Sequence, residues 1–385
     1  MTKYSRACKQ LPFWLAVLNK IGSWGIHLRR RNHQLPPVPR KVLLICLENI
    51  PEVIHTLPAI QTLKKAFPEI RMDYMGGDWM QSLLSAHPAI DHTLIYQAPW
   101  IACETPSAVH QKANPFVKGW ELRKNQYDTI ICFQPDFRLK LIAAMTGAPL
   151  RIGYGLQDEF LLTHTSMFED TELRYLQHLK LLEIFQISDL VTDPKIIPPS
   201  SDVNSTQAIL DGLQPNRRLI VIRPGGTRIE FQWEVAKFRT LIEQCIKDEF
   251  QVLILGGPGE TELLNEITVD MVSENVQIWN FPTFGEVAAL AKYTSIYLGL
   301  NSSTSHVMAA MGVPSVILCG SQKFTGTLPM GLDYILIYSD TVCDKCKAGS
   351  TDKSAKQNCT CMKNISVEQV ITAYETQVKT LQKED

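Results

Sequence analysis

The chain lacks an excess of either charge, a long hydrophobic run and a low-complexity tract. Its 385 residues include 38 Lys and Arg against 39 Asp and Glu, which leaves a formal net charge of −1. Without a broad basic surface, we expect no nucleic-acid partner. No apolar run is long enough to cross a bilayer and no small-residue cleavage site follows the first one, which disfavours a transmembrane span and a signal peptide. No solenoid repeat is present.

The sequence also lacks the cysteine spacing of a disulfide framework. Most of its ten cysteines stand singly inside apolar runs, as Cys46, Cys132, Cys245 and Cys319 do. Such positions are typical of free thiols in a reducing compartment. We therefore expect an intracellular, cytoplasmic protein.

Four cysteines near the C-terminus form two pairs, Cys343 with Cys346 and Cys359 with Cys361. Four thiolates are able to hold zinc in a tetrahedral site, but the second pair lacks the two-residue spacing common in structural sites. Free thiols are the preferred interpretation, zinc stays open, and we expect neither a catalytic metal nor a cofactor.

The first forty residues form an extension with its own pattern. Apolar residues recur at steps of three and four between Trp14 and Leu28, and basic residues flank them. This pattern predicts an amphipathic helix within 11–31. A basic helix with tryptophan suits the surface of an anionic membrane, whereas the alternative is a helix packed on the protein itself. The proline-rich stretch 34–40 is interpreted as a linker.

From residue 41 onward, strand and helix patterns alternate in two blocks. With 45% hydrophobic residues the chain can bury two cores. Repeated β-α units predict parallel sheets covered by helices, hence an α/β protein of two Rossmann-like domains. We expect the domains to span 41–195 and 206–378, with a boundary in the Pro-, Ser- and Asp-rich stretch 193–205. Predicted strands are 42–46, 71–75, 92–96, 127–133, 151–155, 218–224, 251–257, 276–278 and 295–300, and predicted helices include 53–67, 138–145, 175–187, 233–247, 260–272, 284–292 and 365–378.

Candidate functional residues follow the predicted strands, where open α/β sheets bind ligands. After the first strand, Glu52 lies at a helix start, where the dipole favours its ionised form. Such a carboxylate can act as a general base toward a hydroxyl. It can equally serve the helix alone.

The loops of the second block are suited to bind a phosphate and a nucleoside. In 223–228, paired glycines let the backbone approach a ligand, and Arg228 is able to grip phosphate oxygens. A plain turn with a solvated Arg is the alternative. In 256–260, Glu260 can accept hydrogen bonds from a ribose. A third cluster, Asn301–His306, joins the end of a strand to a helix N-terminus, which suits an anion or simply caps the helix.

The order and spacing of six segments resemble glycosyltransferase family 9, the bacterial heptosyltransferase-like enzymes, over nearly all of 41–370. The segments include KVLLICLENIPEVIHTLPAIQTLKKAFPEI, YDTIICFQPDFRLKLIAAMTGAPLRIGYG, RLIVIRPGGTRIEFQWEVAKF and LNSSTSHVMAAMGVPSVILCG. The resemblance implies a GT-B fold, in which two Rossmann-like domains face each other across a cleft. It also implies inverting, metal-independent sugar transfer, with the acceptor in the N-terminal half and the nucleotide-sugar donor mostly in the C-terminal half.

The resemblance assigns Glu52 as catalytic base, and residues in three loops depart from the family pattern. The first loop has Pro51-Glu52 where the family usually has Gly-Asp, Phe231 stands where a Lys commonly contacts donor phosphate, and Asn301 replaces a carboxylate. Losing one charged phosphate contact costs about 1.5–3 kcal/mol, which weakens an enzyme without forbidding turnover. The donor-binding residues implied are Gly226, Thr227, Arg228, Glu260, Asn301, Ser302, Ser303 and His306.

Two hypotheses of function remain. The first is an active glycosyltransferase that moves a heptose or related sugar from a nucleotide-sugar, an ADP-sugar above all, to a lipopolysaccharide-core or other surface glycan acceptor. The second is a catalytically degenerate relative that binds a sugar nucleotide or a partner without turnover. Either protein would lie in the cytoplasm, with contact to the inner face of the cytoplasmic membrane through 11–31 as a further expectation.

Overall fold

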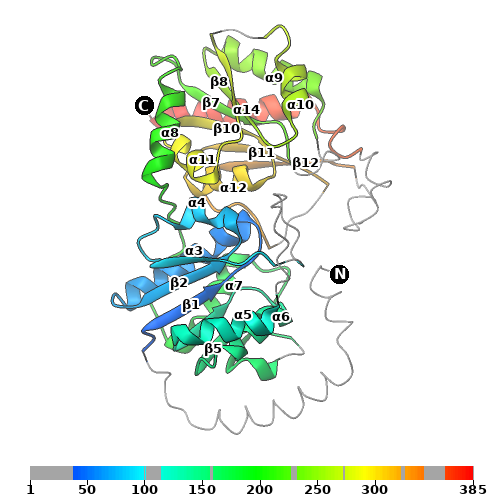
Figure 1. Cartoon of the computed structure of the whole chain (residues 1–385). Coiled ribbons are helices and arrows are strands. Elements are labelled where there is room, and N and C mark those ends of the chain that lie inside the picture. The colour runs from blue at the N-terminus through cyan, green and yellow to red at the C-terminus, as the bar shows by residue number, and fades with distance from the viewer. Residues whose placement is uncertain are drawn as a thin grey trace. The chain divides into compact units, whose positions relative to one another are not determined.

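The computed structural model describes residues 38–98, 100, 114–156, 159–226, 232–271, 274–321, 326–341 and 360–384. The chain divides into two compact units, each with a parallel sheet (Figure 1). The first unit runs to Lys195 and also takes in the short segment Thr325–Leu328. The second begins at Ile196 and contains the rest of the chain.

The first unit is built on a six-stranded sheet with the order β3-β2-β1-β4-β5-β6. All of its neighbouring strands pair in parallel, so both faces must be covered and the central strands are apolar throughout. The order reverses between β1 and β4, and such a reversal opens a crevice at the carboxyl ends of the two strands. The strands are β1 (Lys41–Ile45), β2 (Arg71–Gly76), β3 (His92–Ile95), β4 (Thr129–Cys132), β5 (Leu150–Gly155) and β6 (His164–Met167).

Helices of the first unit connect these strands. The longest, α3, has Pro51 at its first turn, where a missing N–H costs nothing, and two lysines in its last turn, where the helix dipole favours positive charge. One face of α3 packs against α7. The helices are α3 (Ile50–Ala66), α4 (Gln81–Leu84), α5 (Pro115–Leu122), α6 (Phe137–Met145) and α7 (Arg174–Lys180), with short 3₁₀ turns at Asp78–Met80, Arg123–Asn125, Glu159–Leu161 and Glu183–Phe185.

The second unit repeats the same topology with the strand order β12-β11-β10-β7-β8-β9. All pairs are again parallel, and the order reverses between β10 and β7. The strands are β7 (Leu219–Arg223), β8 (Gln251–Gly256), β9 (Val276–Asn280), β10 (Thr294–Leu300), β11 (Ser315–Gly320) and β12 (Tyr334–Tyr338).

The core of the second unit lies between this sheet and the helices α9, α10 and α14. Trp233 is almost fully buried there, and its indole N–H donates to the Ile365 carbonyl at 2.9 Å, so burial leaves this polar group satisfied. The helices are α8 (Ser200–Leu210), α9 (Val235–Lys247), α10 (Thr261–Thr268), α11 (Phe284–Ala291), α12 (Ser303–Ala310) and α14 (Val367–Glu384).

The predicted fold class, α/β with two Rossmann-like domains of the GT-B type, is confirmed. Two edge strands, β6 and β12, and the short helix α5 were not predicted, because each is brief and only partly buried. Helix α8 starts inside the predicted boundary 193–205 and packs on α11, with the Thr206 hydroxyl donating to Glu286 O. That the two domains face each other across a cleft stays a prediction.

The expected amphipathic helix within 11–31 and the cysteines Cys343, Cys346 and Cys359 lie outside the described residues. Cys361 is described and is buried. The cysteines predicted to stand singly in apolar strands and helices are buried as well, and Cys46 and Cys245 are free thiols. None of the helices in the described ranges is both long and apolar enough to cross a bilayer.

Candidate functional site

The loops after β1 and β4 meet at the point where the strand order of the first sheet reverses. The backbone N–H of Leu47, just past β1, donates to the side-chain oxygen of Gln134, just past β4, at 2.6 Å. Both residues are buried, at 1% and 2% exposure. This hydrogen bond joins the two loops and satisfies a backbone group that has no partner in the sheet.

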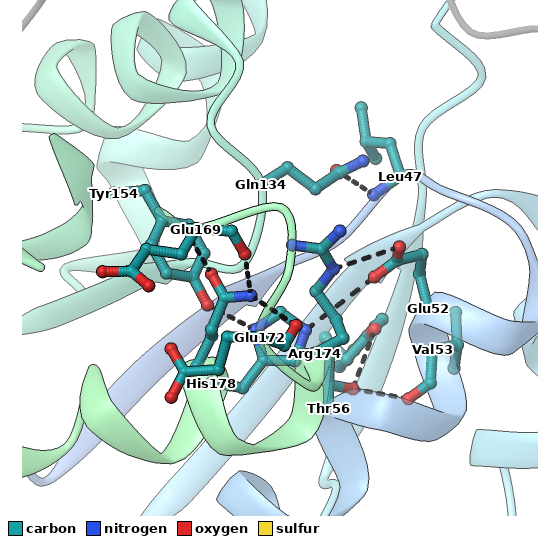
Figure 2. Close-up of polar contacts among 12 residues, drawn as sticks. Leu47, Glu52, Val53, Thr56, Gln134, Tyr154, Glu169, Glu172, Arg174 and His178 are labelled. Carbon is teal, nitrogen blue, oxygen red and sulfur yellow. Dashed lines mark hydrogen bonds and ion pairs between the residues drawn. The ribbon is translucent and has the colours of Figure 1, made fainter. Parts of the chain in front are cut away.

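Glu52 lies in the first turn of α3, directly behind this junction (Figure 2). Its Oε1 is 3.4 Å from Nε of Arg174, and its Oε2 is 4.0 Å from Nε2 of His178. The Glu52 side chain is 13% exposed, the Arg174 side chain 9%, and His178 is fully buried. The carboxylate is therefore paired with a guanidinium on one side while part of it still reaches solvent.

His178 is held in place by aromatic neighbours. Its Nδ1 lies 2.7 Å from the hydroxyl of Tyr154, and its ring meets the Phe133 ring edge-on at 4.9 Å between centroids. Burial, with the nearby His55 and Arg174, lowers the pKa of His178 well below its usual value, and burial raises that of Tyr154 well above its own. At neutral pH both rings are therefore uncharged, and the 4.0 Å contact to Glu52 involves a neutral imidazole.

The second unit has a different charged pair at its strand ends. Arg223, the last residue of β7, grips the Glu260 carboxylate with both terminal nitrogens, and its Nη2 donates to Oε1 at 3.0 Å. The Gly257 N–H donates to Oε2 of the same carboxylate at 2.7 Å. Both charged side chains are 13% exposed. Glu260, which we expected to bind ribose, thus joins the loop after β8 to the end of β7.

Two glycines are required by this pair. A Cβ atom on Gly225 would lie 2.2 Å from the carboxyl carbon of Glu260, and one on Gly257 would lie 2.5 Å from Nη2 of Arg223. Gly226 has no such constraint, since its nearest neighbour, a methyl group of Leu300, would lie at 3.8 Å. Gly225 after β7 and Gly257 after β8 thus stand where the ion pair fills the space that a side chain would take.

The remaining donor-binding candidates gather at the start of α12. Asn301 and Ser302 are half-buried between β10 and the helix, where the Ser302 N–H donates to the Ser305 hydroxyl at 3.0 Å. Ser303 and His306 are buried inside the helix, at 8% and 3% exposure. Burial lowers the pKa of His306 to about 4, so it enters any ligand contact as a neutral imidazole.

Gly226 is thus placed next to Leu300 at the end of β10, and Glu260 next to Gly225, so the three loops of the second unit converge at one edge of its sheet. Thr227, Arg228 and Phe231 lie outside the described residues. Among the residues that are described, no group of three or more His, Cys, Asp or Glu side chains is arranged to hold a metal ion.

Four residues that contribute to these arrangements were not among the predicted site residues. Gln134 and Arg223 stand at the ends of predicted strands, so a systematic search of strand ends would have found them. Arg174 and His178 carry a weaker signal: Arg174 directly precedes the predicted helix 175–187 and His178 lies inside it, and their spacing of four residues places them on one face only if the helix begins at Arg174. Nothing in the sequence says that this face meets Glu52.

Residues 118–356 match the profile described as Glycosyltransferase family 9 (heptosyltransferase), and because the match covers more than half of the chain, the chain belongs to this family. The prediction of a glycosyltransferase is confirmed at the level of the family. The chain is 24% identical over 280 residues to lipopolysaccharide heptosyltransferase 3 of Escherichia coli, covering 70% of this chain and 80% of that protein.

Solved structures resemble the whole architecture. A glycosyl transferase family 9 protein from Veillonella parvula has a TM-score of 0.72 at 21% identity and covers 89% of this chain and 97% of its own. The E. coli ADP-heptose LPS heptosyltransferase II has a TM-score of 0.71 at 18% identity, covering 90% and 100%. At these identities the likeness establishes the fold.

Proposed function

We propose that this protein is an inverting, metal-independent glycosyltransferase that moves a heptose or related sugar from a nucleotide-sugar to a lipopolysaccharide-core acceptor, with Glu52 as general base. In this step Glu52 takes the proton of an acceptor hydroxyl. The hydroxyl oxygen bonds to the anomeric carbon from the face opposite the leaving group. The bond from that carbon to the diphosphate oxygen breaks, and the nucleoside diphosphate leaves with the electron pair.

The observation that carries this proposal is the position of Glu52 in a chain of this family. It lies at the carboxyl end of β1, beside the reversal of strand order where open α/β sheets bind ligands. Its pairing with Arg174 supports the ionised form that a base needs. Its 13% exposure leaves an approach from solvent.

On the donor side, the loops that converge on Glu260 support nucleotide binding. A carboxylate has about four lone-pair sites. Among the described residues, Arg223 and Gly257 use three of them, so one acceptor position on Oε1 is left for a ribose hydroxyl in this part of the chain. The proposed donor residues are those implied by the family resemblance: Gly226, Thr227, Arg228, Glu260, Asn301, Ser302, Ser303 and His306.

An ADP-sugar is the proposed donor, because the solved E. coli relative is named for ADP-heptose. The proposed acceptor follows the names of the lipopolysaccharide heptosyltransferases among the relatives. An acceptor of this kind is anchored in a membrane, which agrees with the proposed position in the cytoplasm at the inner membrane face, through residues 11–31.

The test is turnover by the purified full-length protein. ADP-, GDP- and UDP-sugars are each supplied with a lipopolysaccharide-core acceptor, and release of nucleoside diphosphate is followed without added metal and with EDTA. We expect turnover with an ADP-sugar, unaffected by EDTA, and a loss of at least about 100-fold in Glu52→Gln, in the range expected for a general base. Full activity of a folded Glu52→Gln protein would reject the assignment of the base.

The same experiment separates the active enzyme from a catalytically degenerate relative. Donor binding measured by calorimetry, with no turnover for any donor and acceptor pair, would identify the degenerate protein. Phe231→Lys adds the cation that the family commonly has at this position. We expect about 10-fold tighter donor binding in this variant, the size of one charged contact, and unchanged affinity would contradict a donor phosphate at this place.

A further inference from the structure

One face of α7 is directed at Glu52. Arg174 and His178 are four residues apart, so they project from the same side of the helix. Figure 2 shows both side chains pointing from α7 toward the carboxylate at the start of α3. Their nitrogens lie 3.4 Å and 4.0 Å from the two different oxygens of Glu52.

The Arg174 side chain is held rigidly. Its guanidinium stacks 4.4 Å above the Phe168 ring, and its backbone N–H donates to Gly326 O at 2.8 Å. Gln177 of α7 stabilises the loop before this helix, because its side-chain amide donates a hydrogen bond to Glu169 O at 2.6 Å. A cation in the first turn of a helix is opposed by the helix dipole. The position of Arg174 in the first turn of α7 is therefore explained by the Glu52 carboxylate that it faces.

The Nη1 group of Arg174 is a further hydrogen-bond donor of the guanidinium. It is buried and has no hydrogen-bond partner among the residues that the structure describes. Buried guanidinium donors are normally paired, because an unmade hydrogen bond costs the full desolvation of the group. Nε and Nη1 donate on different sides of the guanidinium, so the Glu52 carboxylate that faces Nε leaves Nη1 to another acceptor.

Arg174 is the permanent cation among the described groups around Glu52. Burial raises the pKa of the nearby thiol and of both phenols and lowers that of His178, which makes these four groups neutral at pH 7. The groups are Cys46 and Glu48 at the end of β1, His55 on α3, Tyr74 in β2, Tyr154 in β5, Glu172 before α7, and Arg174 and His178 on α7.

The Tyr154 hydroxyl determines which nitrogen of His178 carries the proton. If Nδ1 held it, Nε2 would turn a lone pair toward the negative carboxylate of Glu52. The other tautomer, with the Tyr154 hydroxyl donating to Nδ1 and an N–H on Nε2, places a positive dipole end there instead. Electrostatics therefore assign the proton to Nε2, facing Glu52.

We propose that Arg174 and His178 are positioning residues that hold Glu52 ionised and fix its direction for sugar transfer. This inference rests on the proposed role of Glu52 as base. Arg174 supplies the charge that favours the carboxylate form, and His178 supplies an N–H dipole whose direction Tyr154 sets.

The test is the pH profile of kcat for Arg174→Gln, Arg174→Lys and His178→Gln in the full-length protein. An opposite charge within 4–6 Å shifts a carboxylate by about 1–3 pH units. In Arg174→Gln we expect the acidic limb to move about 1–2 units to higher pH, with kcat falling about 10- to 100-fold at pH values below the wild-type limb and the donor KM unchanged. Arg174→Lys keeps the charge and should leave the limb in place.

The controls use Arg151, a half-buried arginine of the same unit that donates to Leu161 O at 2.9 Å. Arg151→Gln should lower stability without moving the pH profile. If Arg174→Gln does not fold, Arg174→Met is compared with Arg151→Met; an acidic limb shifted in the first alone supports the inference, and an unshifted limb overturns it. For His178→Gln we expect a decrease in kcat of about 3- to 10-fold at every pH, a modest loss suited to a single neutral dipole.

The outcomes separate this inference from the proposed function. An inactive Glu52→Gln together with an unshifted limb in Arg174→Gln would overturn the positioning role and leave the base in place. An active Glu52→Gln would remove the base, and the positioning role with it. If the acidic limb of the pH profile shifts in Arg174→Gln and keeps its wild-type position in Arg174→Lys, the role of Glu52 as base and the positioning role of Arg174 are both supported.

Discussion

The ion pair between Arg223 and Glu260 makes a sharp prediction about the second unit. Arg223→Met keeps much of the side-chain volume and removes the guanidinium. The Glu260 carboxylate, 13% exposed, then keeps the Gly257 N–H as its described hydrogen-bond donor. Because desolvation of a charge is no longer compensated by the opposite charge, we expect the free energy of unfolding to fall.

The magnitude follows from the burial of the pair. Removing one partner of a fully buried ion pair costs about 3–5 kcal/mol. Here both side chains retain some exposure and one backbone donor remains, so the expected loss is smaller, about 2–3 kcal/mol. Glu260→Gln should cost a similar amount, because it leaves the guanidinium facing an amide. The double variant should lose clearly less than the sum.

Urea unfolding monitored by circular dichroism measures these differences, with the two-unit chain fitted to two transitions where the curve requires them. The double-mutant cycle isolates the coupling between the side chains, which we expect at about 1.5–2 kcal/mol. Lys65→Met, which removes an exposed ion pair with Asp189 in the first unit, is the control and should change stability by less than about 1 kcal/mol. Additive single losses would refute the view that the pair holds the strand-end loops together.

Three further outcomes test other parts of the structure. Gly225→Ala should destabilise the second unit and weaken donor binding, because the new Cβ would lie 2.2 Å from the carboxyl carbon of Glu260. Gly226→Ala should fold like wild type, because its Cβ would have open space. Equal melting temperatures of the two variants would contradict this. His306 has a folded-state pKa of about 4 against an ordinary 6.5, so the unfolded chain binds more protons between these values and stability is lost as pH falls through that window, by up to about 3 kcal/mol. In His306→Gln the dependence of the unfolding free energy on pH between 6.5 and 4 should be flatter, and an unchanged slope would rule out this residue as a cause. Gln134→Ala leaves a buried backbone N–H without its acceptor and should cost about 1–3 kcal/mol in urea unfolding, while Gln207→Ala on exposed α8 should cost little.

The periodicity of the sequence was sufficient to predict the central strands. β1, β4, β7, β8 and β10 are buried on both faces, so their residues must be apolar without interruption, and this leaves a pattern that needs no knowledge of neighbours. The edge strands β6 and β12 contact one neighbour and remain partly exposed, and their composition differs little from that of loops. The long helices were found from a different pattern, apolar residues that recur at the spacing of one helix face.

The residues of the candidate site likewise include some that the sequence could predict and some that it could not. Strand order and loop position, together with the family resemblance, were enough to select Glu52 and Glu260, because a residue that follows a strand directly has its place set by local chain geometry. Their partners, Arg174 and Arg223, lie 122 and 37 residues away in sequence. A charge that acts over a few ångströms leaves no mark on such distant positions in the chain.

The sequence by itself thus determined the α/β class, the two Rossmann-like blocks, the family and the carboxylate at the end of the first strand. The tertiary structure decided which charged groups come into contact. It placed α7 beside α3, so that Glu52 contacts Arg174 and the neutral His178. It also placed the loop after β8 against the end of β7. Local propensity and hydrophobic period act between near neighbours, whereas these electrostatic contacts exist only once packing has brought remote segments within hydrogen-bonding distance.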